Sequence, residues 1–190
     1  SEAEILHLEN YLARGGSVLY FKNAGVRELS NLDTVLDEWG IRFDYKAVMD
    51  SSYNIGSNPM YVVANFIEHD INEYFESHNY YVVTPVVNPI RQDFGNGTGS
   101  QVSVILGSSD YAYARAIDGE TEDNSLAKQA SDEEGPFVLA AASERSFTKE
   151  DGTTCTGKIF AIGTNRFYSD NLLEASSTGN SAYMKEVISW

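Results

Sequence analysis

Two adjacent serines after a predicted strand are the first candidates for chemistry. Ser108 and Ser109 stand in the phrase 107–111, Gly-Ser-Ser-Asp-Tyr, directly after an apolar run. A nucleophile elbow places its serine at such a turn, but the closing glycine that allows the tight bend is missing here. A serine hydrolase also needs a histidine base, and no motif marks any histidine in this chain. The histidines all precede the serines: His7, His69 and His78. We therefore expect a loop rather than a catalytic centre.

The remaining reactive side chains also lack the neighbours that their chemistry requires. The single cysteine, Cys155, lies in a polar stretch with no apolar strand before it and no helical pattern after it, which argues against an activated thiolate. His69 stands between Glu68 and Asp70, but consecutive side chains point in different directions and do not easily converge on one metal ion. We expect Asp70 to cap a short helix and His69 to lie in a turn.

Two loops carry groups typical of ion or phosphate sites. Segment 118–123 is rich in carboxylates but lacks the glycine turn and distal glutamate of an EF-hand, so a solvated loop is favoured over a weak calcium site. Its acidic residues are Asp118, Glu120, Glu122 and Asp123. Segment 95–99 is glycine-rich, but neither a lysine nor a helix follows it as in a phosphate-binding loop. The sequence therefore predicts no metal site and no cofactor.

The elements that would position these side chains alternate between helix and strand. Apolar residues at helical spacing predict helices over 5–12 and 29–39, and strands at 17–21 and 41–45 follow them. A short helix is expected over 71–75 and a final one from 181 onward. Further apolar runs predict strands at 60–65, 80–84, 102–106, 137–142 and 158–162. Near-continuous apolar strands between helices indicate a mainly parallel central sheet in a three-layer, flavodoxin-like α/β sandwich.

A ligand surface in such a fold lies at the carboxyl ends of the parallel strands. Polar residues that follow the predicted strands are therefore our candidates for ligand binding. They are Asn23, Asp50, Ser108, Ser109, Asp110, Glu144, Asn165 and Arg166. The alternative, which remains open, is that these residues only cap helices and turns. Tyrosines outside the apolar stripes, such as Tyr111 and Tyr113, are candidates for protein contacts.

Size and charge limit the classes of protein and partner. A chain of 190 residues is long enough for one domain with its own core. Twenty-eight acidic and 13 basic side chains give a formal charge of −15, which repels phosphate backbones and argues against nucleic acid. No apolar run approaches the roughly 18 residues that cross a bilayer. The chain begins at Ser1 and ends at Trp190 within a helical pattern, so we expect a soluble fragment of a longer protein.

Several local phrases, in their order, carry a family resemblance. Segment 9–21 resembles the helix, Gly-Gly turn and strand of domains similar to class I glutamine amidotransferases. The whole series resembles the auxiliary domain of GldG-type ABC transport systems, the gliding-motility-associated family. The other phrases lie at 29–41, 69–71, 132–140, 162–171 and 179–190. At position 70 the chain has aspartate where the family phrase has proline.

The resemblance implies a function as well as a fold. It implies a bacterial domain at the extracytoplasmic face of the cell membrane, tethered by segments outside this chain and working beside ABC permease and ATPase subunits. It brings no catalytic residues, so a non-catalytic role in binding or assembly is the leading interpretation. Two alternatives stay open: a degenerate or unrecognised amide or ester hydrolase, and a sugar- or peptide-binding module that feeds a permease.

Overall fold

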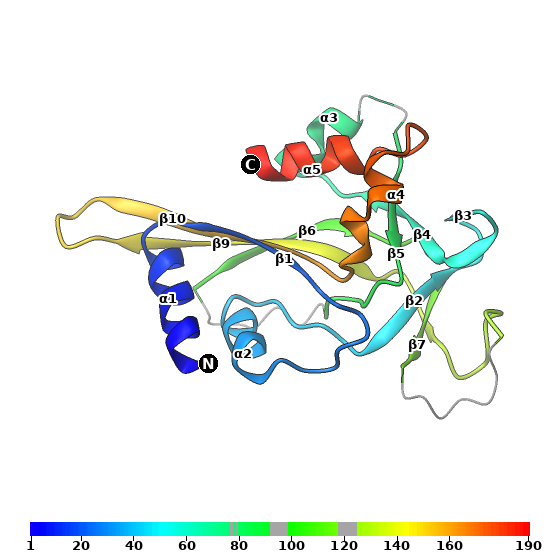
Figure 1. Ribbon diagram of the computed structural model, residues 1–190, viewed down its shortest axis with the longest axis horizontal. Coiled ribbons are helices and arrows are strands. Elements are labelled where there is room, and N and C mark those ends of the chain that lie inside the picture. Colours follow the sequence, from blue (N-terminus) through cyan, green and yellow to red (C-terminus); the bar gives the residue numbers. More distant parts are fainter. Residues whose placement is uncertain (77, 79, 92–98, 118–124) are drawn as a thin grey trace.

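The computed structural model describes residues 1–76, 78, 80–91, 99–117 and 125–190. Within these residues the chain forms a seven-stranded sheet, a second sheet of three strands, and helices on both faces of the larger sheet (Figure 1). The larger sheet has the order β1 (Ser17–Phe21), β10 (Thr154–Ile162), β9 (Val138–Thr148), β6 (Gln101–Gly107), β4 (Asn58–Phe66) and β3 (Asn54–Ile55), and β5 (Val82–Pro85) pairs with β4. The smaller sheet has the order β2 (Lys46–Asp50), β7 (Ala112–Ala116) and β8 (Glu133–Glu134).

Strand direction overturns the expected fold class. Only β1 and β10 pair in parallel among the strands described, and the other paired strands of both sheets are antiparallel. The prediction of a mainly parallel, flavodoxin-like sheet is therefore wrong, and the fold is mixed α/β with mostly antiparallel sheets. Helices cover both faces of the larger sheet, so its antiparallel strands are as uniformly apolar as parallel strands would be.

Alternating residues of β9 and β10 face two separate hydrophobic cores. One core contains Ala141 and Ala161 and packs against α1 (Glu2–Ala13) and α2 (Ser30–Glu38). The other contains Ala140 and Ile162 and packs against α3 (Glu73–Glu76) and α5 (Asn180–Ser189). Because successive strand residues point to opposite faces, β9 and β10 contribute side chains to both cores. Figure 1 shows α1 and α2 on one side of the sheet and α3 and α5 on the other.

Most element positions match the expectations from the sequence. The strands expected at 17–21, 60–65 and 102–106 correspond to β1, β4 and β6, and the helices expected at both ends correspond to α1 and α5. The strand expected at 41–45 is wrong, because this segment contains only an isolated bridge at Phe43 and the strand begins at Lys46. The short helix is also capped differently: the His69 side chain accepts a hydrogen bond from Ile71 N, 3.2 Å away.

The remaining helical segments are α4 (Asp170–Leu173) and the short 3-10 turns η1 (Asp70–Asn72) and η2 (Arg166–Tyr168). None of the helices in the described ranges has the length and apolar character needed to cross a membrane.

Candidate binding site at the ends of β1 and β10

Three of the predicted ligand-binding residues meet beside the only parallel pair in the described part of the chain. Asn23 follows β1, while Asn165 and Arg166 follow β10. Because β1 and β10 run in parallel, their carboxyl ends lie at the same edge of the sheet. All three residues line one pocket of about 490 Å³. They also line a shallower polar hollow next to it, together with Asp170.

Most of the remaining pocket wall is apolar and comes from both sheets. Met49 of β2, Met60 of β4 and Leu126 contribute long aliphatic side chains. A mainly apolar wall with a few polar groups at its rim is typical of small-molecule and side-chain pockets. Methionine adapts its shape to different apolar partners. The pocket is therefore suited to a group with an apolar part, which packs against the wall, and a polar end, which reaches Asn23, Asn165 and Arg166.

A close backbone contact fixes the turn that carries Asn165 and Arg166. A Cβ atom at Gly163 would lie 1.8 Å from the carbonyl oxygen of Asn88, so only glycine fits there. The next residue, Thr164, is fully buried, and its hydroxyl donates to the carbonyl oxygen of Pro85 at 2.5 Å. The same hydroxyl accepts a hydrogen bond from the backbone N–H of Arg166 at 3.0 Å. This turn is therefore held firmly against the end of β5.

The charged rim residue Arg166 is exposed, and its guanidinium has no hydrogen-bond or ion-pair partner within the described ranges. Asn23 is also exposed, and its side-chain oxygen accepts a hydrogen bond from Gly25 N at 3.1 Å. A free guanidinium can bind a carboxylate or a carbonyl group. The rim thus offers a cation and amide groups next to the apolar pocket.

Backbone strain occurs at the same pocket. Val86 lines the wall and has a φ of 49°. A β-branched residue in the left-handed region is an outlier that costs on the order of 1–3 kcal/mol. Such strain persists only where the surrounding structure enforces it, and it is frequent at ligand-binding sites. The outlier is a second reason to regard this pocket as a candidate site.

A largely buried ion pair holds Arg115, one of the residues that line the pocket. The guanidinium of Arg115 donates two hydrogen bonds to Asp132, at 2.8 and 2.7 Å, and the side chains are 14% and 0% exposed. It also donates to the carbonyl oxygens of Ser125 and Ala127, which fixes the segment that carries Leu126. Hydrogen bonding to Arg115 lowers the pKa of Asp132 below its usual value of 3.8.

A second group of predicted residues forms a buried hydrogen-bond cluster. Ser109 Oγ donates to Asp50 Oδ2 at 2.5 Å. The other oxygen of Asp50 accepts from the backbone N–H groups of Ser52 and Tyr53 at 2.9 and 2.8 Å. Asp50 is fully buried, so this arrangement joins β2 to the loop after β6. It fits the alternative in which such residues only stabilise turns.

The predicted residue Glu144 lies away from both groups. It was expected to follow a strand, but β9 continues to Thr148 and contains it. It forms an ion pair with Lys158 at 3.4 Å. β9 runs opposite to β1, β6 and β10, so its carboxyl end lies at the other edge of the sheet.

The candidate nucleophiles have hydrogen-bond partners other than histidine. Ser108 Oγ accepts from Phe137 N at 2.8 Å and donates to the carbonyl oxygen of Ser109 at 3.2 Å. Cys155 Sγ donates to the carbonyl oxygen of Ala13 at 3.4 Å. His69 packs edge-on against the Trp190 ring. In the described ranges these contacts give the hydrolase alternative no support.

Other sequence-based candidates have mixed outcomes. The acidic segment 118–123 and residues 95–98 lie outside the described residues. Tyr111 is exposed, as expected of a contact residue, whereas Tyr113 is fully buried and its hydroxyl bonds to Leu126 O. Over the residues described, no group of three or more His, Cys, Asp or Glu side chains could hold a metal ion.

The apolar wall of the pocket was not predicted from the sequence. Met49 belongs to β2, which lies outside every strand expected from the sequence. The run from Lys46 to Asp50 contains three consecutive apolar residues, and this signal could have identified the strand. Arg115 and Leu126 lie in segments with no distinctive pattern, and only the tertiary structure brings them to the pocket.

Comparison with known proteins places the chain in a family. No curated protein sequence matches it. Its fold is similar to that of a solved structure described as "mmIFT52 N-terminal domain", with a TM-score of 0.64 and 17% sequence identity, over 100% of this chain and 71% of that chain. At that identity the likeness shows the fold alone. Residues 1–188 match the family described as "ABC-type uncharacterized transport system". Because this match covers almost the whole chain, the protein belongs to that ABC-type transport family.

Proposed function

We propose that this domain is a non-catalytic binding and assembly domain of an ABC-type transport system. It works at the extracytoplasmic face of the bacterial membrane, as the resemblance to GldG-type auxiliary components implies. Segments outside this chain tether it there. Family membership supports a transport-associated role, and the pocket at the ends of β1 and β10 supports binding as the activity.

The observation that carries the proposal is the composition of that pocket. The pocket has a volume of about 490 Å³ and a mainly apolar wall, so it can accept an apolar side chain from a partner. The free guanidinium of Arg166 lies at its rim. Buried apolar anchors next to a charged rim are typical of protein–protein contacts. We therefore propose that a loop of the permease, or of another subunit of the complex, inserts an apolar residue here and pairs an acidic group with Arg166.

A binding measurement with a charge-reversed variant tests the proposal. The purified domain is titrated against the detergent-solubilised permease–ATPase complex of the same system, and affinity is measured by biolayer interferometry. Arg166→Glu replaces an attractive contact by a repulsive one, so we expect at least about a tenfold loss of affinity.

The matched control for this experiment is Arg14→Glu. Arg14 is also exposed, follows α1, and lines neither of the two hollows. We expect it to leave the affinity within about twofold of the original protein, because a rim charge outside the contact contributes little. Absence of binding by the unaltered domain, or an equal loss in both variants, would refute the proposed site.

A further inference from the structure

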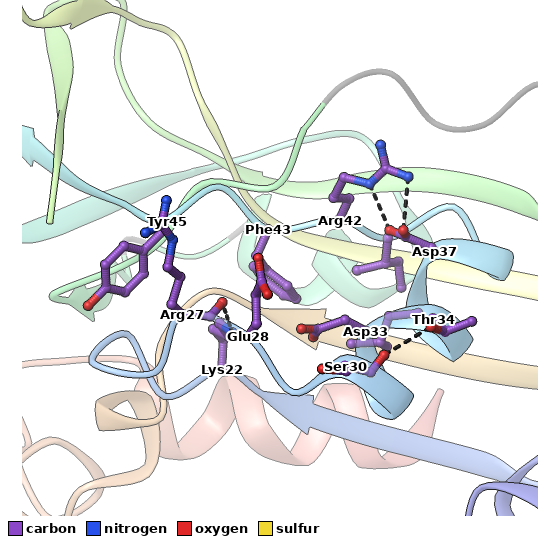
Figure 2. A pocket seen from close by; sticks show the side chains of 12 residues that line it. Lys22, Arg27, Glu28, Ser30, Asp33, Thr34, Asp37, Arg42, Phe43 and Tyr45 are labelled. Carbon is purple, nitrogen blue, oxygen red and sulfur yellow. Dashed lines mark hydrogen bonds and ion pairs between the residues drawn. The ribbon is translucent and has the colours of Figure 1, made fainter. Parts of the chain in front are cut away.

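A second cavity, of about 440 Å³, lies between the end of β1, helix α2 and the segment 41–45. Figure 2 shows the side chains of Lys22 and Glu28, from the loop after β1, and of Asp33, from α2, around it. Its lining shares no residue with the pocket described above, although the loop after β1 borders both. The cavity has aromatic side chains in its wall, Phe43 and Tyr45.

A buried lysine is the most unusual group in this cavity. Lys22 is only 2% exposed, and its backbone N–H is fixed by a hydrogen bond to the carbonyl oxygen of Ile162 at 2.9 Å. Its ammonium group donates to the carbonyl oxygen of Arg27 at 3.3 Å and forms no ion pair with any residue that the structure describes. An ammonium has three donors, and a buried charge is costly unless it is paired. Two donors of Lys22 therefore remain for a ligand.

Among the other charged side chains of the cavity, some form an ion pair with each other and others have no oppositely charged partner in the described residues. Arg42 and Asp37 bind each other through two hydrogen bonds of 2.8 and 2.9 Å. Arg27 lies over the ring of Tyr45, 5.7 Å from its centre, and has no carboxylate partner within the described ranges. Two cations, Lys22 and Arg27, thus remain without an anionic partner.

Two carboxylates in the same lining have no cationic partner in the described part of the chain. Glu28 is exposed at the mouth of the cavity. Asp33 accepts a hydrogen bond from Leu29 N at 2.6 Å through Oδ2, which leaves Oδ1 available. Burial, with a smaller contribution from the charge of Asp33, raises the pKa of Tyr20 to about 12.

We propose that this cavity binds a small zwitterion, such as a free amino acid or a dipeptide. The ligand carboxylate binds Lys22 and Arg27, the ligand ammonium binds Glu28 and Asp33, and its side chain packs against Phe43. Opposite charges in one lining favour a ligand that carries both, whereas a phosphate dianion would be repelled by the two carboxylates. The inference does not rest on the assembly function proposed above, because it concerns a separate cavity.

Calorimetric titration of the whole domain with matched ligands tests this inference. The probes are alanine, phenylalanine and the dipeptide Ala-Ala. N-acetyl-Ala-Ala lacks the ammonium group, and Ala-Ala amide lacks the carboxylate. We expect at least one zwitterion to bind and both blocked dipeptides to bind at least about tenfold more weakly than Ala-Ala, because each leaves two protein charges without a partner. Amide chemical shifts should change mainly at residues 22–45.

Two variants and a control complete the test. Lys22→Met keeps the aliphatic stem and removes the ammonium, while Glu28→Gln removes one carboxylate at an exposed position that tolerates change. Both should weaken binding at least about tenfold, whereas Lys185→Met, at an exposed lysine of α5, should not. If Lys22→Met fails to fold, Glu28→Gln and the chemical shifts decide the matter.

Three results would overturn the inference. The first is that none of the zwitterions binds at about 10 mM. The second is that the blocked dipeptides bind as well as Ala-Ala, and the third is that Glu28→Gln leaves the affinity unchanged. None of these results bears on the pocket at the ends of β1 and β10, because no transporter subunit is present in the experiment.

Discussion

At the scale of single residues, the ion pair of Arg115 and Asp132 should give a measurable part of the stability. Asp132→Asn removes the carboxylate that the largely buried guanidinium of Arg115 binds, so we expect a loss of about 3 kcal/mol in the free energy of unfolding at neutral pH. Arg115 lowers the pKa of Asp132 below 3.8, so the stabilisation is present above that value and is lost as the pH falls through the folded-state pKa. Urea unfolding measured from neutral to acid pH should show the two proteins converging below about pH 4.

Asp110→Asn is the control for this comparison. Asp110 is exposed, so its substitution should change the free energy of unfolding by less than about 0.5 kcal/mol. A difference between the original protein and Asp132→Asn that stays constant down to acid pH would mean that the pair does not lower the pKa of Asp132.

The residue scale also shows what the sequence could predict of the site. Asn23, Asn165 and Arg166 come together as expected, because β1 and β10 are indeed parallel. Asp50 and Ser109 come together for a different reason, as partners in a buried cluster. Polar residues after strands have the same appearance in sequence whether they bind a ligand or fix a turn, so type and position alone could not separate the two groups.

At the scale of elements, helix and strand positions were largely predictable but strand direction was not. Burial by helices on both faces removes the alternation that would have marked β9 and β10 as antiparallel. The connection could not reveal it either. In the structure the segment from Lys149 to Thr153 joins the two strands and is too short for a parallel crossover, which needs about a dozen residues. The strands expected at 137–142 and 158–162 leave the whole of 143–157 between them, because the polar ends of both strands resemble a loop in the sequence.

The packing of helix α1 on β10 depends on the absence of a side chain at one position. A Cβ atom at Gly157 would lie 2.4 Å from the carbonyl oxygen of Leu12 and 2.9 Å from the Trp39 ring. We expect Gly157→Ala to push the helix away from the sheet and to lower the free energy of unfolding by about 2 kcal/mol. Hydrogen exchange should become faster in α1 and remain unchanged in α5.

The matched substitution is Gly25→Ala, where the nearest atom to the added Cβ would be Asn23 Oδ1 at an ordinary 3.5 Å. It should leave exchange in α1 as it is. Equal protection of α1 in both alanine variants would show that the helix can shift at no cost.

At the scale of the whole molecule, a formal charge of −15 on 190 residues should make stability depend on salt. Like charges repel one another most in the compact state, and salt screens this repulsion, so the free energy of unfolding should rise between about 10 mM and about 0.5 M NaCl. Affinity for the transporter complex should change in the opposite direction, because salt would also screen the proposed pairing of an acidic group with Arg166. Stability is read from urea unfolding and affinity from biolayer interferometry over the same salt series. Near the pH of zero net charge the rise in stability should vanish; a rise that persists there would point to salt effects on apolar burial instead.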